Sequence, residues 1–168
     1  MKTLLLMRHA KSDWDADYSV DHERPLNARG IRSARLMGRL ISGLDLTPNH
    51  VMSSTAVRAR TTAALASEAG GWQTQIDLES GFYGSGPEAV LDIAAGAPKV
   101  ERLMLVGHQP TWGMMVNRLT GAVADMKTAS VAAIAFMIND WGDLGSAQGV
   151  LTSLQHPKPY FGSQWDLG

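Results

Sequence analysis

The chain has 168 residues, and 15 Lys and Arg against 16 Asp and Glu give it a formal net charge of −1. This length fits one domain with a sizeable hydrophobic core, which we expect to span residues 1–168, and the near-neutral charge excludes an overall field that would favour nucleic acid or an anionic membrane as a partner. Cysteine is absent, which excludes disulfides, thiol nucleophiles and thiolate metal sites and is consistent with a reducing cytoplasm.

The first predicted element is a strand over residues 2–7, because this short continuous apolar run suits a strand that is covered on both faces. Arg8 and His9 interrupt the run before it reaches the length of a signal-peptide core, so we do not expect secretion. The longest later apolar stretch, residues 131–138, is far shorter than the roughly 20 residues of a membrane-spanning helix. We therefore expect a soluble, cytoplasmic protein.

The next elements alternate between helix and strand after a polar, irregular segment. Residues 28–44 predict an amphipathic helix, because their apolar positions recur at steps of three and four. A short strand is expected at 50–52, followed by a helix within residues 53–71 that has Ser54 as a candidate N-cap and glycines at its end.

The second half of the chain continues this alternation. We expect a strand at 73–78, a helix from 86 with proline in its first turn, a strand at 101–107, a helix at 111–119, and strands at 130–138 and 147–154. The pattern predicts an α/β fold with three layers: a mainly parallel central sheet, helices on both of its faces, and an antiparallel strand from the C-terminal part.

Side chains suited to phosphate follow several of these strands. Arg8 and His9 follow the first strand, Arg58 lies in the first turns of the helix after the second, and His108 follows the strand at 101–107. In such sheets ligands bind beyond the carboxyl ends of the strands, so we expect these residues to meet at one edge. Arginine offers forked, permanently charged donors for a phosphoryl group, and an imidazole with an ordinary pKa of about 6.5 is a nucleophile near neutral pH.

Four separated motifs resemble those of one known family. They read RHAKSDW at 8–14, RPLNARG at 24–30, SSTAVRARTTA at 53–63 and VGHQP at 106–110. Their order and spacing are similar to those of the histidine phosphatase superfamily, and in particular to its short branch of SixA-type phosphohistidine phosphatases. The resemblance implies a single histidine phosphatase-like domain over residues 1–168.

The resemblance also implies a role for each matched residue. His9 occupies the position of the histidine that attacks phosphorus and becomes phosphorylated. Arg8, Arg58 and His108 occupy the positions that bind the phosphoryl oxygens, and Arg24 is similar to an additional phosphate-binding arginine of the short branch. A covalent step of this kind needs an activated nucleophile and donors already in place where charge shifts in the transition state.

The general acid is the least determined part of this site. In larger members of the family a glutamate after the third strand protonates the leaving group, and Glu79 lies nearest to that position. An exposed loop carboxylate is an equal alternative for Glu79. The imidazole of a phosphohistidine leaves more easily than an alkoxide, and His108 is a further candidate for proton transfer. The chain also has Ala10 where the family usually has glycine.

No metal and no cofactor are expected. The sequence has no HExxH or similarly spaced set of metal ligands, and arginine side chains supply the positive charge that a divalent ion would otherwise provide. Trp14 is expected either to form a wall of the cleft or to contact a partner.

The short connections leave little material for a cap over the cleft, which suits a phosphate group presented on a protein. The leading hypothesis is therefore a phosphatase that acts through a phosphohistidine intermediate on phosphohistidine of a partner protein. A small-molecule phosphomonoesterase is the alternative enzyme, and a noncatalytic phosphoprotein-binding module is the alternative of another class. The sequence gives no indication of an oligomeric state.

Overall fold

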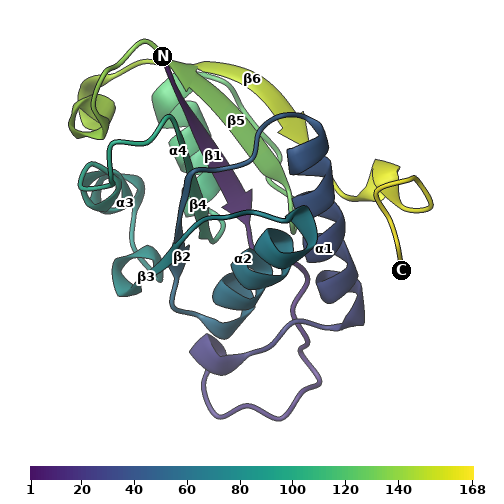
Figure 1. Cartoon of the computed structure of the whole chain (residues 1–168). Helices are drawn as coiled ribbons and strands as arrows, with labels where there is room; N and C mark the ends of the chain where they lie inside the picture. The colour runs from purple at the N-terminus through teal and green to yellow at the C-terminus, as the bar shows by residue number, and fades with distance from the viewer.

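A computed structural model describes all 168 residues and shows a six-stranded sheet with helices on both faces (Figure 1). The strands are β1 (Lys2–Arg8), β2 (His50–Ser54), β3 (Ile76–Glu79), β4 (Arg102–Gly107), β5 (Val131–Phe136) and β6 (Val150–Gln155). The α-helices are α1 (Ala28–Gly43), α2 (Val57–Gly70), α3 (Pro87–Ala94) and α4 (Thr111–Thr120). Short 3-10 helices are η1 (Asp21–Glu23), η2 (Ser80–Phe82), η3 (Trp141–Ser146) and η4 (Lys158–Tyr160).

The strand order is β3-β2-β4-β1-β5-β6. The strands β3, β2, β4 and β1 pair in parallel, whereas β5 pairs antiparallel with β1 and β6 pairs antiparallel with β5. This arrangement confirms the expected three-layer α/β fold with a mainly parallel sheet and an antiparallel C-terminal part. The carboxyl ends of β1, β2 and β4 consequently lie at the same edge of the sheet.

The apolar run at the start of the chain is continuous because both faces of β1 are covered. Leu4 and Leu6 belong to the core beneath α3 and α4, whereas Leu5 and Met7 belong to the core beneath α1 and α2. Alternate side chains of a strand point to opposite faces, so a central strand needs apolar residues at every position. The same pattern recurs in β4.

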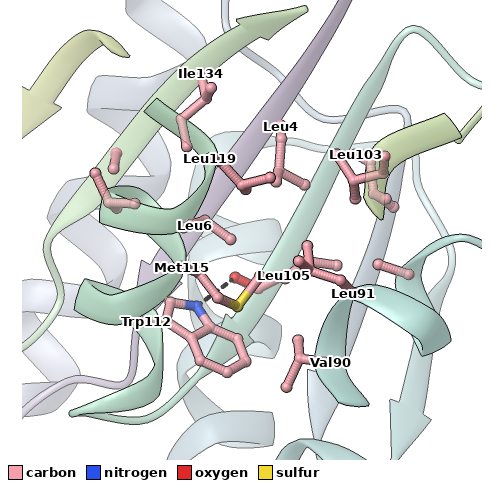
Figure 2. Packing of buried hydrophobic residues seen from close by; sticks show 14 of the residues in the cluster. Leu4, Leu6, Val90, Leu91, Leu103, Leu105, Trp112, Met115, Leu119 and Ile134 are labelled. Atoms are coloured by element: carbon pink, nitrogen blue, oxygen red, sulfur yellow. Dashed lines mark hydrogen bonds between the residues drawn. The ribbon is translucent and has the colours of Figure 1, made fainter. Parts of the chain in front are cut away.

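Trp112 anchors α4 to the sheet on the first of these faces (Figure 2). Its ring is fully buried, and its Nε1 donates a hydrogen bond to the carbonyl oxygen of Leu105 at 3.2 Å. A Cβ at Gly107 would lie 2.2 Å from this ring, so the last position of β4 admits no side chain. The backbone that leads into His108 is thus fixed by close packing.

Two sequence expectations about helix ends have different outcomes. The glycine stop of α2 is confirmed, because Gly71 adopts a left-handed conformation with φ 66°. The serine N-cap is wrong: α2 begins at Val57, its N-cap residue is Ala56, and no side chain caps it. Ser54 instead accepts a hydrogen bond from the Ala56 backbone N–H at 3.2 Å, in the turn before the helix.

No helix in the structure combines the length and the hydropathy needed to span a bilayer.

Candidate active site

A cavity of about 400 Å³ lies at the sheet edge where β1, β2 and β4 end. In Figure 1 the arrowhead of β1 points toward the purple connection between β1 and α1, which borders this edge. The residues that line the cavity include five singled out from the sequence: Arg8, His9, Arg24, Arg58 and His108. The structure therefore brings together side chains that are up to about a hundred residues apart in the chain.

His9 is positioned as a neutral imidazole. Its Nδ1 lies 2.7 Å from the carbonyl oxygen of Ala10, and because a carbonyl only accepts, Nδ1 carries the proton. Burial, reinforced by the nearby His108, Arg58 and Arg8, lowers the pKa of His9 to about 3 against the opposing effect of the Ala10 carbonyl. The lone pair of His9 is therefore on Nε2 and is available at neutral pH.

Ala10 belongs to the same arrangement. Its side chain is fully buried, and its backbone N–H donates a hydrogen bond to Thr62 Oγ1 at 2.9 Å, while that hydroxyl donates to the carbonyl oxygen of Arg58 at 2.6 Å. Helix α2 thus holds the backbone N–H of Ala10, the residue whose carbonyl contacts the His9 ring. The alanine that departs from the family pattern is accommodated in the core.

His108 lies across the cavity from His9, with 5.2 Å between the ring centroids. Its Nε2 is 2.8 Å from Ser54 Oγ, at the end of β2. Its Nδ1 is buried and has no hydrogen-bond partner within the protein. Burial, reinforced by the charge of Arg58, lowers the pKa of His108 to about 4, so this ring is also neutral near pH 7.

Three guanidinium groups surround the imidazoles. Arg8 donates from Nη1 to the carbonyl oxygen of Met126 at 3.0 Å, and Arg58 donates from Nη1 to the carbonyl oxygen of Asp21 at 2.8 Å. Arg24 donates from Nη1 to Ser12 Oγ. The Nε atoms of Arg8 and Arg58 are buried without a partner within the protein. Buried donors without acceptors are costly, and their presence in cationic groups around one cavity fits an anionic ligand.

The Asp21 carboxylate links two of these arginines, a feature that the sequence interpretation missed. Its Oδ1 accepts from Arg24 Nε at 3.2 Å and Nη2 at 3.0 Å, and its Oδ2 accepts from Arg58 Nη2 at 3.0 Å and Tyr83 Oη at 2.9 Å. Burial alone would raise the pKa of Asp21, but the hydrogen bonds from Tyr83 and Arg24 lower it to about 2. The only sequence signal was the spacing of an aspartate three residues before Arg24.

Trp14 covers Arg24 at the rim of the cavity. The guanidinium carbon lies 3.7 Å from the centroid of the indole ring, which is a cation–π contact, and the tryptophan remains largely exposed. Trp14 lines the cavity, which agrees with the expectation that it forms a wall of the cleft. Its exposed surface also leaves it free to contact a bound molecule.

Glu79 does not line the cavity. It ends β3, which is the edge strand, and is therefore separated from β1 by β2 and β4. Beyond Glu79 the chain turns through η2, and it is Tyr83 and Gly84 that reach the cavity. The structure thus offers no support for Glu79 as the general acid.

The chain is similar in sequence to proteins of one known family. Residues 4–82 match the sequence model of the histidine phosphatase superfamily (branch 1). An uncharacterized protein of Mycobacterium tuberculosis is 31% identical to the chain over 168 residues, covering 90% of the chain and 100% of that protein.

Solved structures give the same result. A protein from Nakamurella multipartitia, assigned as a phosphohistidine phosphatase SixA, superposes with a TM-score of 0.81 and 30% identity over 93% of this chain and 96% of that one. The protein histidine phosphatase SixA in complex with tungstate superposes with a TM-score of 0.77 and 20% identity over 95% and 99%, which supports the fold.

Proposed function

The chain belongs to the histidine phosphatase superfamily and is a SixA-like phosphatase, and on that premise we propose that its substrate is phosphohistidine on a partner protein. The observation that carries the proposal is the neutral His9 ring, whose Nδ1–H is held by the Ala10 carbonyl and whose Nε2 is free in a cavity with three guanidinium groups. A neutral imidazole is the nucleophile, and the guanidinium groups bind the anion that it attacks.

The proposed reaction has two steps. The Nε2 lone pair of His9 forms a bond to phosphorus as the bond between phosphorus and the substrate imidazole nitrogen breaks, and the substrate nitrogen takes a proton from solvent. A water oxygen then attacks the phosphorus on His9, the bond to Nε2 breaks, and inorganic phosphate leaves, while the water's hydrogens pass to the phosphate and to solvent. The net reaction consumes one water and returns His9 to its neutral form.

The donors around the cavity would stabilise charge on the phosphoryl oxygens in both steps. Arg8 and Arg58 each retain a buried Nε–H without a protein acceptor, and His108 retains a buried Nδ1. Arg24 is held by Asp21 and Ser12 at the entrance. Donors that are already oriented need little rearrangement as charge shifts during the reaction, which is the main source of catalysis by such sites.

Leaving-group chemistry favours phosphohistidine over an alkyl phosphate. An alkoxide needs a strong acid when it leaves, and Glu79 does not line the cavity. An imidazole nitrogen leaves more readily and can take its proton from solvent. The 30% identity to a structure assigned as SixA supports the same substrate class.

Metal independence is part of the proposal. No group of three or more His, Asp or Glu side chains is arranged to hold a metal ion. The arginines supply positive charge at the reacting centre without one. Turnover is therefore expected to be unchanged by a chelator.

The proposal is tested with a ³²P-phosphohistidine protein in the presence of EDTA. Wild-type protein is expected to release phosphate and to carry a base-stable, acid-labile label, and His9→Ala is expected to do neither. Binding of the phosphoprotein without label transfer would indicate a noncatalytic module. Faster turnover of small phosphate esters than of phosphohistidine would indicate a phosphomonoesterase and overturn the proposed substrate.

A further inference from the structure

A second hollow of about 780 Å³ adjoins the catalytic cavity. We call it the α3–α4 groove: it lies between the start of α3 and the exposed side of α4, and the connection after α4 completes it. Gln109 lines both the groove and the catalytic cavity, so the two share a wall. The Gln109 side chain is fixed there, because its Oε1 accepts a hydrogen bond from the Gly113 backbone N–H at 2.7 Å.

The connection between α4 and β5 also borders both hollows. Val123 and Ala124 line the groove, whereas Thr128 lines the catalytic cavity. Between them, the carbonyl oxygen of Met126 accepts the hydrogen bond from Arg8 Nη1 at 3.0 Å. A molecule that fills the catalytic cavity and extends over Gln109 therefore enters the groove.

The groove differs from the cavity in its chemistry. Met114 is 52% exposed and Val123 is 94% exposed, and both present apolar surface to it. The two charged side chains of the groove, Glu88 and Arg118, pair with each other, with 2.9 Å between Glu88 Oε1 and Arg118 Nε. The groove thus combines exposed apolar surface with a balanced pair of charges beside a cationic cavity, and concave apolar surface with a few polar groups is typical of binding sites.

We propose that the α3–α4 groove binds the polypeptide segment of the partner protein that flanks the phosphorylated histidine, with apolar side chains of that segment against Met114 and Val123. The inference rests on the proposed function. A phosphohistidine whose phosphoryl group lies in the catalytic cavity has its own backbone at the rim, and its neighbours then continue across Gln109. An uncharged apolar segment complements the groove, and methionine adapts its shape to varied side chains. A small phosphate ester has no part that reaches so far.

The test compares three substrates: free phosphohistidine, a short phosphohistidine peptide with leucines beside the histidine, and the same peptide with serines in their place. For the wild type, kcat/KM for the leucine peptide is expected to exceed that for the serine peptide about tenfold. In a Met114→Ser, Val123→Ser double variant this advantage is expected to disappear. Normalising each value to free phosphohistidine separates a lost groove contact from a loss of folded protein.

The matched control is Met137→Ser, Val150→Ser, which changes the same two residue types. Met137 and Val150 are exposed and lie at the opposite edge of the sheet, where β5 ends and β6 begins. This variant is expected to keep the wild-type preference for the leucine peptide.

Different failures have different meanings. If the groove variant keeps the leucine preference, the groove does not bind substrate. The same holds if sedimentation shows a dimer for the wild type and a monomer for the groove variant. In either case the inference is wrong while the proposed function stands. If wild-type protein turns over small esters but not even free phosphohistidine, the proposed function fails and the inference fails with it.

Discussion

The substitution Asp21→Asn tests whether the carboxylate between Arg24 and Arg58 matters for phosphate binding. The carboxylate accepts from Arg24 with one oxygen and from Arg58 and Tyr83 with the other. An amide nitrogen cannot accept, so one of these two sets of donors loses its partner. A hydrogen bond to a charged group contributes about 1.5–3 kcal/mol, and solvent screening at a side chain that is half exposed reduces this toward about 1.4 kcal/mol.

We therefore expect Asp21→Asn to lower kcat/KM about tenfold, since 1.4 kcal/mol corresponds to roughly a factor of ten. Removal of the negative charge alone would strengthen anion binding. Water screens that repulsion at the exposed carboxylate, however, so loss of the arginine geometry dominates. Steady-state kinetics on phosphohistidine measures kcat/KM, and calorimetric titration with tungstate measures anion affinity. Both are expected to fall.

The matched control is Asp140→Asn. Asp140 pairs with Lys99 at 3.2 Å, and its side chain is 45% exposed, against 48% for Asp21. This variant is expected to retain kcat/KM within about twofold, because its ion pair is far from the cavity and surface pairs contribute little. If Asp21→Asn matched the control in both kcat/KM and tungstate affinity, the positioning role of Asp21 would be refuted.

Two further predictions concern acid sensitivity and packing. Burial lowers the pKa of His9 to about 3 and that of His108 to about 4, so below about pH 6.5 the unfolded chain binds more protons than the folded chain. In phosphate-free buffer the free energy of unfolding should fall by on the order of 1 kcal/mol per histidine between about pH 6.5 and 5.5, and an equal slope in urea titrations of a His9→Gln, His108→Gln variant would contradict this. Gly107→Ala places a methyl group 2.2 Å from the Trp112 ring and should destabilise by about 1–3 kcal/mol, whereas Gly145→Ala meets nothing within 4 Å; equal urea midpoints for the two variants would count against this packing argument.

The architecture could be predicted because the burial of each strand and helix determines where its apolar residues fall in the sequence. Continuous apolar runs in β1 and β4 marked strands covered on both sides, and β-strand and helix patterns alternated as a parallel sheet requires. The first residue of α2 was harder to predict, because any serine that precedes a helix is a candidate N-cap. Tertiary contact with His108 instead holds Ser54 in the strand end.

Some residues of the site could be predicted from the sequence because they lie at strand ends, and others could not. Arg8, His9 and His108 follow directly from strand ends, and the topology of a parallel sheet brings such positions together. Asp21 begins the short 3-10 helix η1, in a segment whose sequence has no hydrophobic periodicity, so the sequence does not reveal its tertiary contacts. Glu79 does not line the cavity, and the sequence does not reveal that its strand, β3, lies at the edge of the sheet.

The antiparallel pairing of β5 with β1 has a consequence for how this scaffold can change. Because β5 runs backwards, the chain that enters it approaches the same rim that β1 leaves, and the α4–β5 connection reaches Arg8 there through Met126. Extra residues inserted into this connection would form a flap over the entrance of the catalytic cavity, and the order of the strands would not change. Such a flap would enclose the cavity and favour small substrates, while the residues at the strand ends stayed in place.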